Sequence, residues 1–393
     1  MEVSRTLFGG LSAEDFLREY WQRKPLLVRE AFPDFVSPCS PDDLATLACM
    51  EGVPSRIILE QGGDIPWEVR FGPFDPEDFA GLPEKYWTLL VQQTDRHVPA
   101  VADLLDVFRF LPNWRMDDVQ ISYAPEHGGA GAHIDSYDVF LVQAHGHRRW
   151  EISTAPAPPD VAFAPGLDIE LLEDFNPDCD WVLAPGDLLY LPPRLPHRGT
   201  ALNECMTMSV GLRAPSHQEI LTSFLERAAD CTPRHAYYTD PGLAPSADPG
   251  RIRPAALAKV RAIIQQTVQD PDAIDRWFAS YVTEPAPDAD LPWPETPCTA
   301  DGVCAALQQG AWLFRTAVAY FAYLPDTEGA RLYACGKEYM LDKALAFAAP
   351  LLSGRKRLTH SILAPHLAMS SFCALLADLV NEGCLQVVEE SPS

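Results

Sequence analysis

Short segments of β-type sequence follow one another between residues 56 and 212, with turn residues and few helical patterns between them. They are residues 56–60, 67–71, 87–92, 119–123, 133–143, 148–152, 181–184, 188–191 and 206–212. Gly128-Gly129, Gly146 and Pro185-Gly186-Asp187 provide turn signals between them. This pattern predicts a β-barrel or a double-sheet jelly roll.

Helical patterns flank these strands. Ser12 precedes an amphipathic stretch and has Asp15 three positions later, which predicts a capped helix that ends before Pro25. Residues 26–28 are expected to form a strand, and a second helix is expected from Ser40-Pro41. After Pro215 the period becomes helical, over residues 219–229, 255–268 and 273–282.

A segment rich in proline and acidic residues, 284–297, indicates a domain boundary. Helices and short strands alternate after it, in an order that resembles a winged helix. We therefore expect four parts: residues 1–214, a strand-rich domain with N-terminal helices; 215–284, a helical region; 285–297, a linker; and 298–393, a winged-helix-like domain.

Charge argues against a general nucleic-acid binder. The formal net charge is −25, from 30 basic and 55 acidic residues in 393, whereas phosphate binding needs a cationic face. Residues 298–393 hold seven basic and nine acidic residues, so even the winged-helix-like part carries −2. The remaining −23 belongs to residues 1–297, and we expect no direct nucleic-acid partner.

Other features favour a cytoplasmic protein. No run of 18 apolar residues indicates a membrane span, and residues 1–10 lack a signal-peptide pattern. The ten cysteines include no Cys-x-x-Cys pair, so we expect reduced thiols that act as small core residues.

The spacing of His133, Asp135 and His197 predicts a metal site. On a strand, residues two apart point to the same face, so His133 and Asp135 would face the same way. His197 follows the stiff segment Pro192-Pro193 and could add a third ligand from a distant strand. Two histidines and one carboxylate suit Fe(II) with coordination positions left open for a cosubstrate and O2.

A guanidinium could hold the far end of a dicarboxylate cosubstrate, because it can donate two parallel hydrogen bonds to a carboxylate. Arg148 and Arg149 begin a predicted strand after the Gly146 turn. Only one of them can face inward, and spacing alone does not choose between them.

Three segments resemble the JmjC-type ribosomal oxygenases, in particular their bacterial branch. They are Gly129–Gln143 with Gly146–Trp150, Pro185–His197, and the opening segment Tyr20–Leu27. The resemblance implies a mixed β and α fold: a double-stranded β-helix (cupin-like JmjC) barrel, a helical dimerisation region and a winged-helix-like C-terminal domain.

The resemblance also implies an activity and its residues. The family's bacterial branch hydroxylates C3 of an arginine in large-subunit ribosomal protein sixteen, with Fe(II), 2-oxoglutarate and O2, and forms homodimers. The implied iron ligands are His133, Asp135 and His197, and the implied site for the distal carboxylate of 2-oxoglutarate is Arg148. Two further pairs are implied: Asp118 and Tyr137 at the substrate arginine, and Thr207 and Ser209 along the cosubstrate pocket.

Two alternatives remain open from the sequence. One is hydroxylation of a histidine in another ribosomal protein, as in the eukaryotic branch. The other is a non-enzymatic cupin-like regulatory protein that uses its winged helix. Under the enzyme hypothesis, the acidic surplus of residues 1–297 could attract a basic ribosomal protein over long range.

Overall fold

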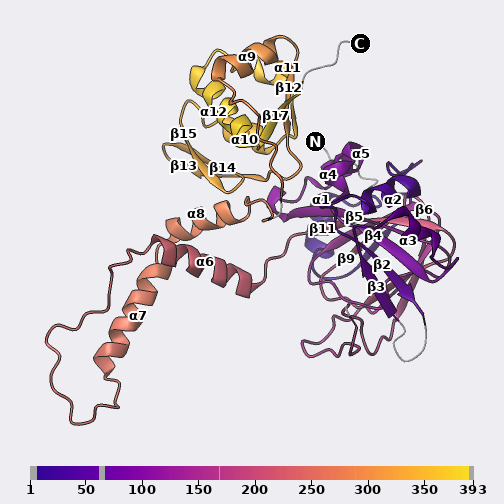
Figure 1. Ribbon diagram of the computed structural model, residues 1–393, viewed down its shortest axis with the longest axis horizontal. Coiled ribbons are helices and arrows are strands. Elements are labelled where there is room, and N and C mark those ends of the chain that lie inside the picture. Colours follow the sequence, from indigo (N-terminus) through magenta and orange to yellow (C-terminus); the bar gives the residue numbers. More distant parts are fainter. Residues whose placement is uncertain (1–6, 62–66, 168, 288, 389–393) are drawn as a thin grey trace. The chain divides into compact units, whose positions relative to one another are not determined.

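The computed structural model describes residues 7–61, 67–167, 169–287 and 289–388. Residues 1–6 of the N-terminal segment considered for a signal peptide, and residue 288 of the predicted linker, lie outside this range. The chain forms two compact units, residues 1–214 and 215–393 (Figure 1). None of the described helices is long and apolar enough to cross a membrane.

The first unit is built on two antiparallel sheets. The larger has the strand order β1-β9-β6-β11-β5-β4-β2-β3, and the smaller has the order β10-β7-β8. The strands of the larger sheet are β1 Leu26–Val28, β2 Ser55–Glu60, β3 Trp67–Phe71, β4 Trp87–Val91, β5 Met116–Ala124, β6 Val139–His145, β9 Leu188–Leu191 and β11 Cys205–Leu212. Those of the smaller sheet are β7 Arg148–Ile152, β8 Cys179–Leu183 and β10 His197–Ala201.

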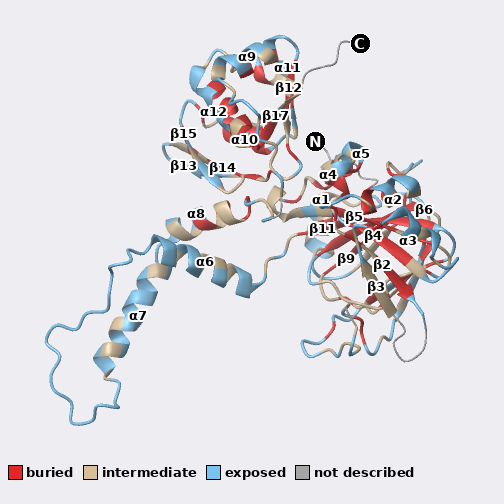
Figure 2. Ribbon diagram, in the orientation of Figure 1, coloured by how far each residue is buried: buried red, intermediate tan, exposed pale blue. Residues whose placement is uncertain are grey.

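Alternation along the strands separates two cores, because successive side chains point to opposite faces of a sheet. On β6, Phe140 packs outward against Phe16 and Tyr190, with ring centroids 5.7 and 5.0 Å away. Its neighbour Leu141 belongs instead to an inner cluster with Trp150 of β7. The predicted double-sheet barrel is therefore confirmed. Its central strands, such as β6 and β9, are largely buried (Figure 2).

Helices cover the outer face of the larger sheet, where they form one hydrophobic core with it. They are α1 Ala13–Glu19, α2 Pro41–Ala48, α3 Pro76–Ala80, α4 Thr94–His97 and α5 Pro99–Leu104, with the 3-10 turns Leu105–Phe108 and Asn113–Arg115. The predicted cap of α1 is confirmed, since the Ser12 side chain accepts a hydrogen bond from the Asp15 backbone N–H. Ser40 caps α2 in the same way, and Pro41 is its first residue.

The predicted strand over residues 133–143 is partly wrong. His133 forms only an isolated bridge with His197, and regular pairing begins at Val139 in β6. The chain bends at residues 136–137, before β6. The distant strand expected to carry His197 is β10, and it begins at His197 itself.

The second unit begins with α6 His217–Cys231, α7 Pro254–Val268 and α8 Pro271–Tyr281. Trp277 and Ala279 of α8 are buried. By contrast, α6 and α7 contain no buried residue and are drawn without red in Figure 2. The helices α9 Ala300–Gln308, α10 Ala348–Ser353, α11 His360–Leu363 and α12 Ser370–Asn381 follow. The three predicted helices are thus present, while the division into helical region, linker and C-terminal domain remains a prediction.

Two three-stranded sheets complete this unit, β16-β12-β17 and β13-β14-β15. Their strands are β12 Trp312–Arg315, β13 Phe321–Asp326, β14 Gly329–Ala334, β15 Lys337–Asp342, β16 Arg357–Leu358 and β17 Leu385–Val388. Leu313 of β12 and Phe372 of α12 are fully buried in the core that these elements share. The unit therefore has a hydrophobic core of its own.

The expectation that every cysteine is a reduced thiol is wrong for two of them. Cys304 of α9 and Cys373 of α12 form a disulfide. The two helices pack together, and the Cα atoms lie 6.3 Å apart, within the range that a disulfide can bridge. The other eight are free, and Cys39, Cys205 and Cys384 are buried as expected.

Candidate functional site

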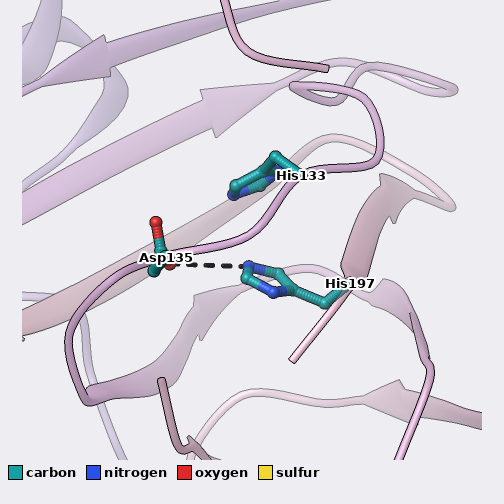
Figure 3. Close-up of side chains that lie close together, drawn as sticks. All are labelled: His133, Asp135 and His197. Atoms are coloured by element: carbon teal, nitrogen blue, oxygen red, sulfur yellow. Dashed lines mark ion pairs between the residues drawn. The ribbon is translucent and has the colours of Figure 1, made fainter. Parts of the chain in front are cut away.

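His133, Asp135 and His197 come together where the segment before β6 pairs with the start of β10. One potential ligand atom from each lies within 4.8 Å of the others, and their side chains point toward one another (Figure 3). The Nε2 atom of His197 is 3.6 Å from a carboxylate oxygen of Asp135. The structure therefore brings together the three residues that the sequence assigned to one site.

The backbone fixes this cluster. His133 and His197 each donate a backbone hydrogen bond to the other's carbonyl oxygen, both at 3.0 Å. The carbonyl oxygen of Asp135 accepts a hydrogen bond from the Arg194 backbone N–H at 2.7 Å. Residues 133 and 135 therefore converge through pairing with the segment around His197, and no continuous strand is required.

Glycines make the close approach possible. Gly131 has a φ of 79°, in the left-handed region that favours glycine. A Cβ atom on Gly129 would lie 2.4 Å from the Gly199 carbonyl oxygen of β10. The glycines before His133 are thus needed for the turn beside the site, as the sequence indicated.

Both imidazole rings offer their Nε2 atoms to the centre of the cluster. The Nδ1 atom of His133 lies 3.1 Å from the Gly131 carbonyl oxygen, and that of His197 lies 2.8 Å from the Leu195 carbonyl oxygen. A carbonyl only accepts, so each Nδ1 donates a proton to its carbonyl, which leaves Nε2 as the nitrogen that can bind a metal. This is the arrangement in which histidines bind metals.

Burial keeps His197 neutral. Its side chain is 3% exposed, and desolvation, aided by the nearby His133, lowers its pKa to about 4. A neutral ring is the form that a metal ligand needs. Two imidazole nitrogens and one carboxylate suit Fe(II), so the donor set fits the ion that the sequence suggested.

A cavity of about 350 Å³ opens beside the three residues. Alternate residues of several strands line it, as expected for the inner face of a barrel. The lining includes Asp118, Gln120 and Ser122 of β5, Arg148 and Trp150 of β7, and Ser209 and Gly211 of β11. Most polar residues that line the cavity therefore face it because side chains alternate along the strands.

Arg148 is the inward-facing arginine. It is 5% exposed, and its Nη1 atom donates to the Ser122 hydroxyl at 3.0 Å. Its Nε and Nη2 atoms are buried without a hydrogen-bond partner among the described residues. Buried donors are rarely left unpaired, so these atoms fit a carboxylate ligand that enters the cavity.

Asp118 and Tyr137 line the same cavity. One Asp118 carboxylate oxygen accepts from the Gln93 backbone N–H at 2.9 Å, and burial raises the pKa of Asp118 to about 6. The side chain of Tyr137 is 42% exposed, which places it toward solvent. The pKa of Tyr137 is raised, chiefly by the negative charge of Asp135 and then by desolvation. Tyr137 lies within the bend at residues 136–137, so the single-strand periodicity expected from the sequence does not account for its place.

The two residues expected along the cosubstrate pocket differ. Ser209 lines the cavity, whereas Thr207 does not. Thr207 is fully buried, and its hydroxyl donates to the Gln143 side-chain oxygen at 3.0 Å. The Thr207 hydroxyl proton is therefore already used in a hydrogen bond to a neighbouring side chain.

Sequence reasoning missed several lining residues. Gln120 and Ser122 share the β5 face of Asp118, and Trp150 shares the β7 face of Arg148, so period two could have identified them. Arg56 of β2 also lines the cavity. Glu170 comes from the loop between β7 and β8, where no period predicts a direction.

Two family matches cover most of the chain. Residues 103–220 match the JmjC domain family, and residues 264–386 match the ROXA-like winged helix. The sequence is 35% identical to the ribosomal protein uL16 3-hydroxylase of Escherichia coli K12, over 95% of this chain and 97% of that protein. The chain belongs to the JmjC-type ribosomal oxygenases.

Solved structures agree with this family. The X-ray structure of E. coli ycfD matches this ribosomal oxygenase with a TM-score of 0.85 and 34% identity, over 96% of this chain and 98% of that one. The E. coli ribosomal oxygenase in complex with cobalt and 2-oxoglutarate matches with a TM-score of 0.82 and the same identity and coverage. The barrel and the winged-helix domain expected from the sequence are therefore confirmed as the fold of this ribosomal oxygenase.

Proposed function

We propose that this ribosomal oxygenase is an Fe(II)- and 2-oxoglutarate-dependent hydroxylase that acts on C3 of an arginine side chain in ribosomal protein uL16. One observation carries the proposal. A convergent set of two imidazole nitrogens and one carboxylate opens into the same cavity as a buried arginine with unpaired donors. The similarity to the uL16 3-hydroxylase over nearly the whole chain supports the substrate.

His133, Asp135 and His197 hold Fe(II) in this proposal, and Arg148 holds the distal carboxylate of 2-oxoglutarate. Bound Fe(II) and 2-oxoglutarate supply the activation of O2, with conversion of 2-oxoglutarate to succinate and CO2. Ser122 orients the Arg148 guanidinium through its hydroxyl. Trp150 and the aliphatic residues Val139 and Leu141 restrict water in the cavity.

Asp118 and Tyr137 bind the substrate arginine. An ionised Asp118 can pair with a guanidinium, and the aromatic face of Tyr137 can stack against it. A guanidinium near Asp118 also favours the ionised form of this carboxyl, whose pKa is raised to about 6 in the free protein. The acid therefore favours arginine over the histidine that the eukaryotic branch hydroxylates.

The test is incubation of purified uL16 with the enzyme, Fe(II), 2-oxoglutarate and O2, followed by mass spectrometry of its peptides. The expected result is the mass of one added oxygen atom on an arginine. Addition to a histidine, in uL16 or another ribosomal protein, would favour the histidyl alternative. No addition to any ribosomal protein would favour the non-enzymatic one.

We also propose a cytoplasmic homodimer. The substrate is a ribosomal protein, which supports the location. Exposed apolar side chains on both α6 and α7 support self-association, because a monomer rarely exposes so many large apolar side chains on consecutive helices. They are Leu221, Leu225, Leu257, Val260, Ile263 and Ile264. Light scattering after size-exclusion chromatography should give twice the chain mass of 43.4 kDa, and Ile263→Asp should lower that mass.

A further inference from the structure

Arg56 is a second cation in the wall of the catalytic cavity. It lies on β2 and lines the same cavity as Asp118 and Tyr137. Its Nε atom is buried and has no hydrogen-bond partner, and no ion pair joins Arg56 to any of the described residues. In a chain with 55 acidic and 30 basic residues, a half-buried arginine without an acidic partner calls for an explanation.

A buried N–H donor that has no acceptor costs free energy in the free protein. Such groups persist where a ligand completes them, because function can oppose stability at a binding site. Arg56 and the site residues described above line the same cavity. The acceptor should therefore belong to one of the molecules that the proposed reaction brings into this cavity.

The cosubstrate does not provide this acceptor. In the cross-strand register, Arg56 of β2 lies opposite Leu90 of β4, and Leu90 lies opposite Ser122 of β5. Arg56 is thus two strand spacings, about 10 Å, from the serine that orients Arg148. The proposed reaction uses one carboxylate of 2-oxoglutarate at the metal and the other at Arg148, so no carboxylate of this molecule remains for Arg56.

The substrate arginine does not provide it either. A guanidinium has donors only, so it cannot accept a hydrogen bond from Arg56. The substrate's main chain always brings carbonyl oxygens, whatever its sequence. Arg56, Leu90 and Ser122 form one cross-strand row, and Asp118 lies four residues along β5 from Ser122. The carboxylate proposed to bind the substrate side chain is therefore separated from the row that contains Arg56.

We propose that Arg56 is a substrate-binding residue whose guanidinium donates hydrogen bonds to main-chain carbonyl oxygens of the protein substrate. This inference rests on the proposed function. It assigns the side chain and the main chain of the substrate residue to different parts of the cavity wall. The side chain goes to Asp118 and Tyr137, and the main chain goes to Arg56.

The test compares Arg56→Met, Arg56→Lys and wild type on a synthetic uL16 peptide in which every acidic residue is replaced by its amide. Arg56→Met should raise the KM for this peptide roughly tenfold or more, the loss expected for hydrogen bonds to a charged donor. Arg56→Lys should fall between the two. The KM for 2-oxoglutarate should not change in either variant.

Two readouts do not depend on turnover. Calorimetric titration of the metal-free protein with the same peptide should show weaker binding for Arg56→Met. The Tm of Arg56→Met should equal or exceed that of wild type, because the variant removes a buried donor that has no acceptor in the free protein. Arg70→Met is the matched control, since Arg70 lies on neighbouring β3, pairs with Glu68 and does not line the cavity.

Several results would overturn the inference. An unchanged peptide KM in Arg56→Met would do so, as would a raised KM for 2-oxoglutarate. A lowered Tm with unchanged peptide affinity would indicate a structural role instead. A defect seen only with peptides that contain acidic residues would assign Arg56 to a side chain of the substrate. If the wild-type enzyme modifies no ribosomal protein, the proposed function fails, and that outcome is separate from these.

Discussion

Arg148 and Arg149 are neighbours in the chain and lie in opposite environments. Arg148 is buried in the cavity and donates to Ser122, whereas Arg149 is exposed and pairs with Asp180 at 3.4 Å. The pleat of β7 alone produces this difference, since successive residues of a strand face opposite sides. The pair therefore provides a matched experiment on cosubstrate binding.

Arg148→Lys should raise the KM for 2-oxoglutarate by tenfold or more, because lysine cannot form two parallel hydrogen bonds with a carboxylate. Arg149→Lys should leave it within about twofold, as expected for an exposed ion pair. Succinate formation at varied 2-oxoglutarate concentration measures both. Equal effects of the two substitutions would contradict the assignment of Arg148.

Replacement of a metal ligand should remove both the metal and the activity. His133→Ala and Asp135→Ala each leave two of the three ligands, so bound iron and uL16 hydroxylation should fall to background. Metal analysis of the purified protein and the mass of uL16 peptides measure the two effects. His145→Ala is the control, because His145 is exposed at the end of β6. Wild-type release of CO2 by either ligand variant would show that the iron assignment is wrong.

Acid should destabilise the metal-free protein through His197. The pKa of this residue is about 4 in the folded protein and about 6.5 in an unfolded chain, so the unfolded state binds more protons between these values. The free energy of unfolding should therefore fall as pH falls from about 6.5 to about 4. Urea unfolding at several pH values measures this slope. His197→Asn should reduce it, and an identical slope in that variant would assign the effect to other groups.

Substrate affinity should depend on pH through Asp118. Because the pKa of Asp118 is raised to about 6, the fraction ionised increases as pH rises through this value. The KM for the uL16 peptide should then decrease over the same range, since the ionised form pairs with a guanidinium. Asp118→Asn should raise the KM at least about tenfold and remove this dependence. A pH profile of KM that is the same in both proteins would exclude Asp118 from substrate binding.

The acidic surplus should matter more for an intact basic protein than for a short peptide. Residues 1–297 carry −23 of the total −25, and salt screens long-range attraction between opposite charges. Raising the salt concentration should therefore increase the KM for intact uL16 more than the KM for its peptide. Parallel kinetics at low and high salt measure this difference. Equal salt dependence would indicate that the acidity serves solubility alone.

The sequence predicted what depends on periodicity and on local signals. The caps at Ser12 and Ser40 follow from residues three positions apart, and the strand pattern predicted the two-sheet barrel. The resemblance added the choice of Arg148 over Arg149, which periodicity left open.

Long-range pairing produced the features that the sequence could not predict. His133 and Asp135 converge with His197 through an isolated bridge and a bend, although the expected reason was a continuous strand. Thr207 follows the strand pattern but bonds to Gln143, and only the packing of β11 against β6 reveals that partner. The disulfide between Cys304 and Cys373 likewise depends on how α9 and α12 meet.

One face of β5 carries Asp118, Gln120 and Ser122 in alternate positions along the cavity. A substitution at one of these positions leaves the alternation of the strand unchanged. Insertion or deletion of one residue within this strand, however, would turn part of this set toward the outer core. Variation at this wall should therefore proceed by substitution, and natural or engineered changes in chain length should be confined to the loops that border it.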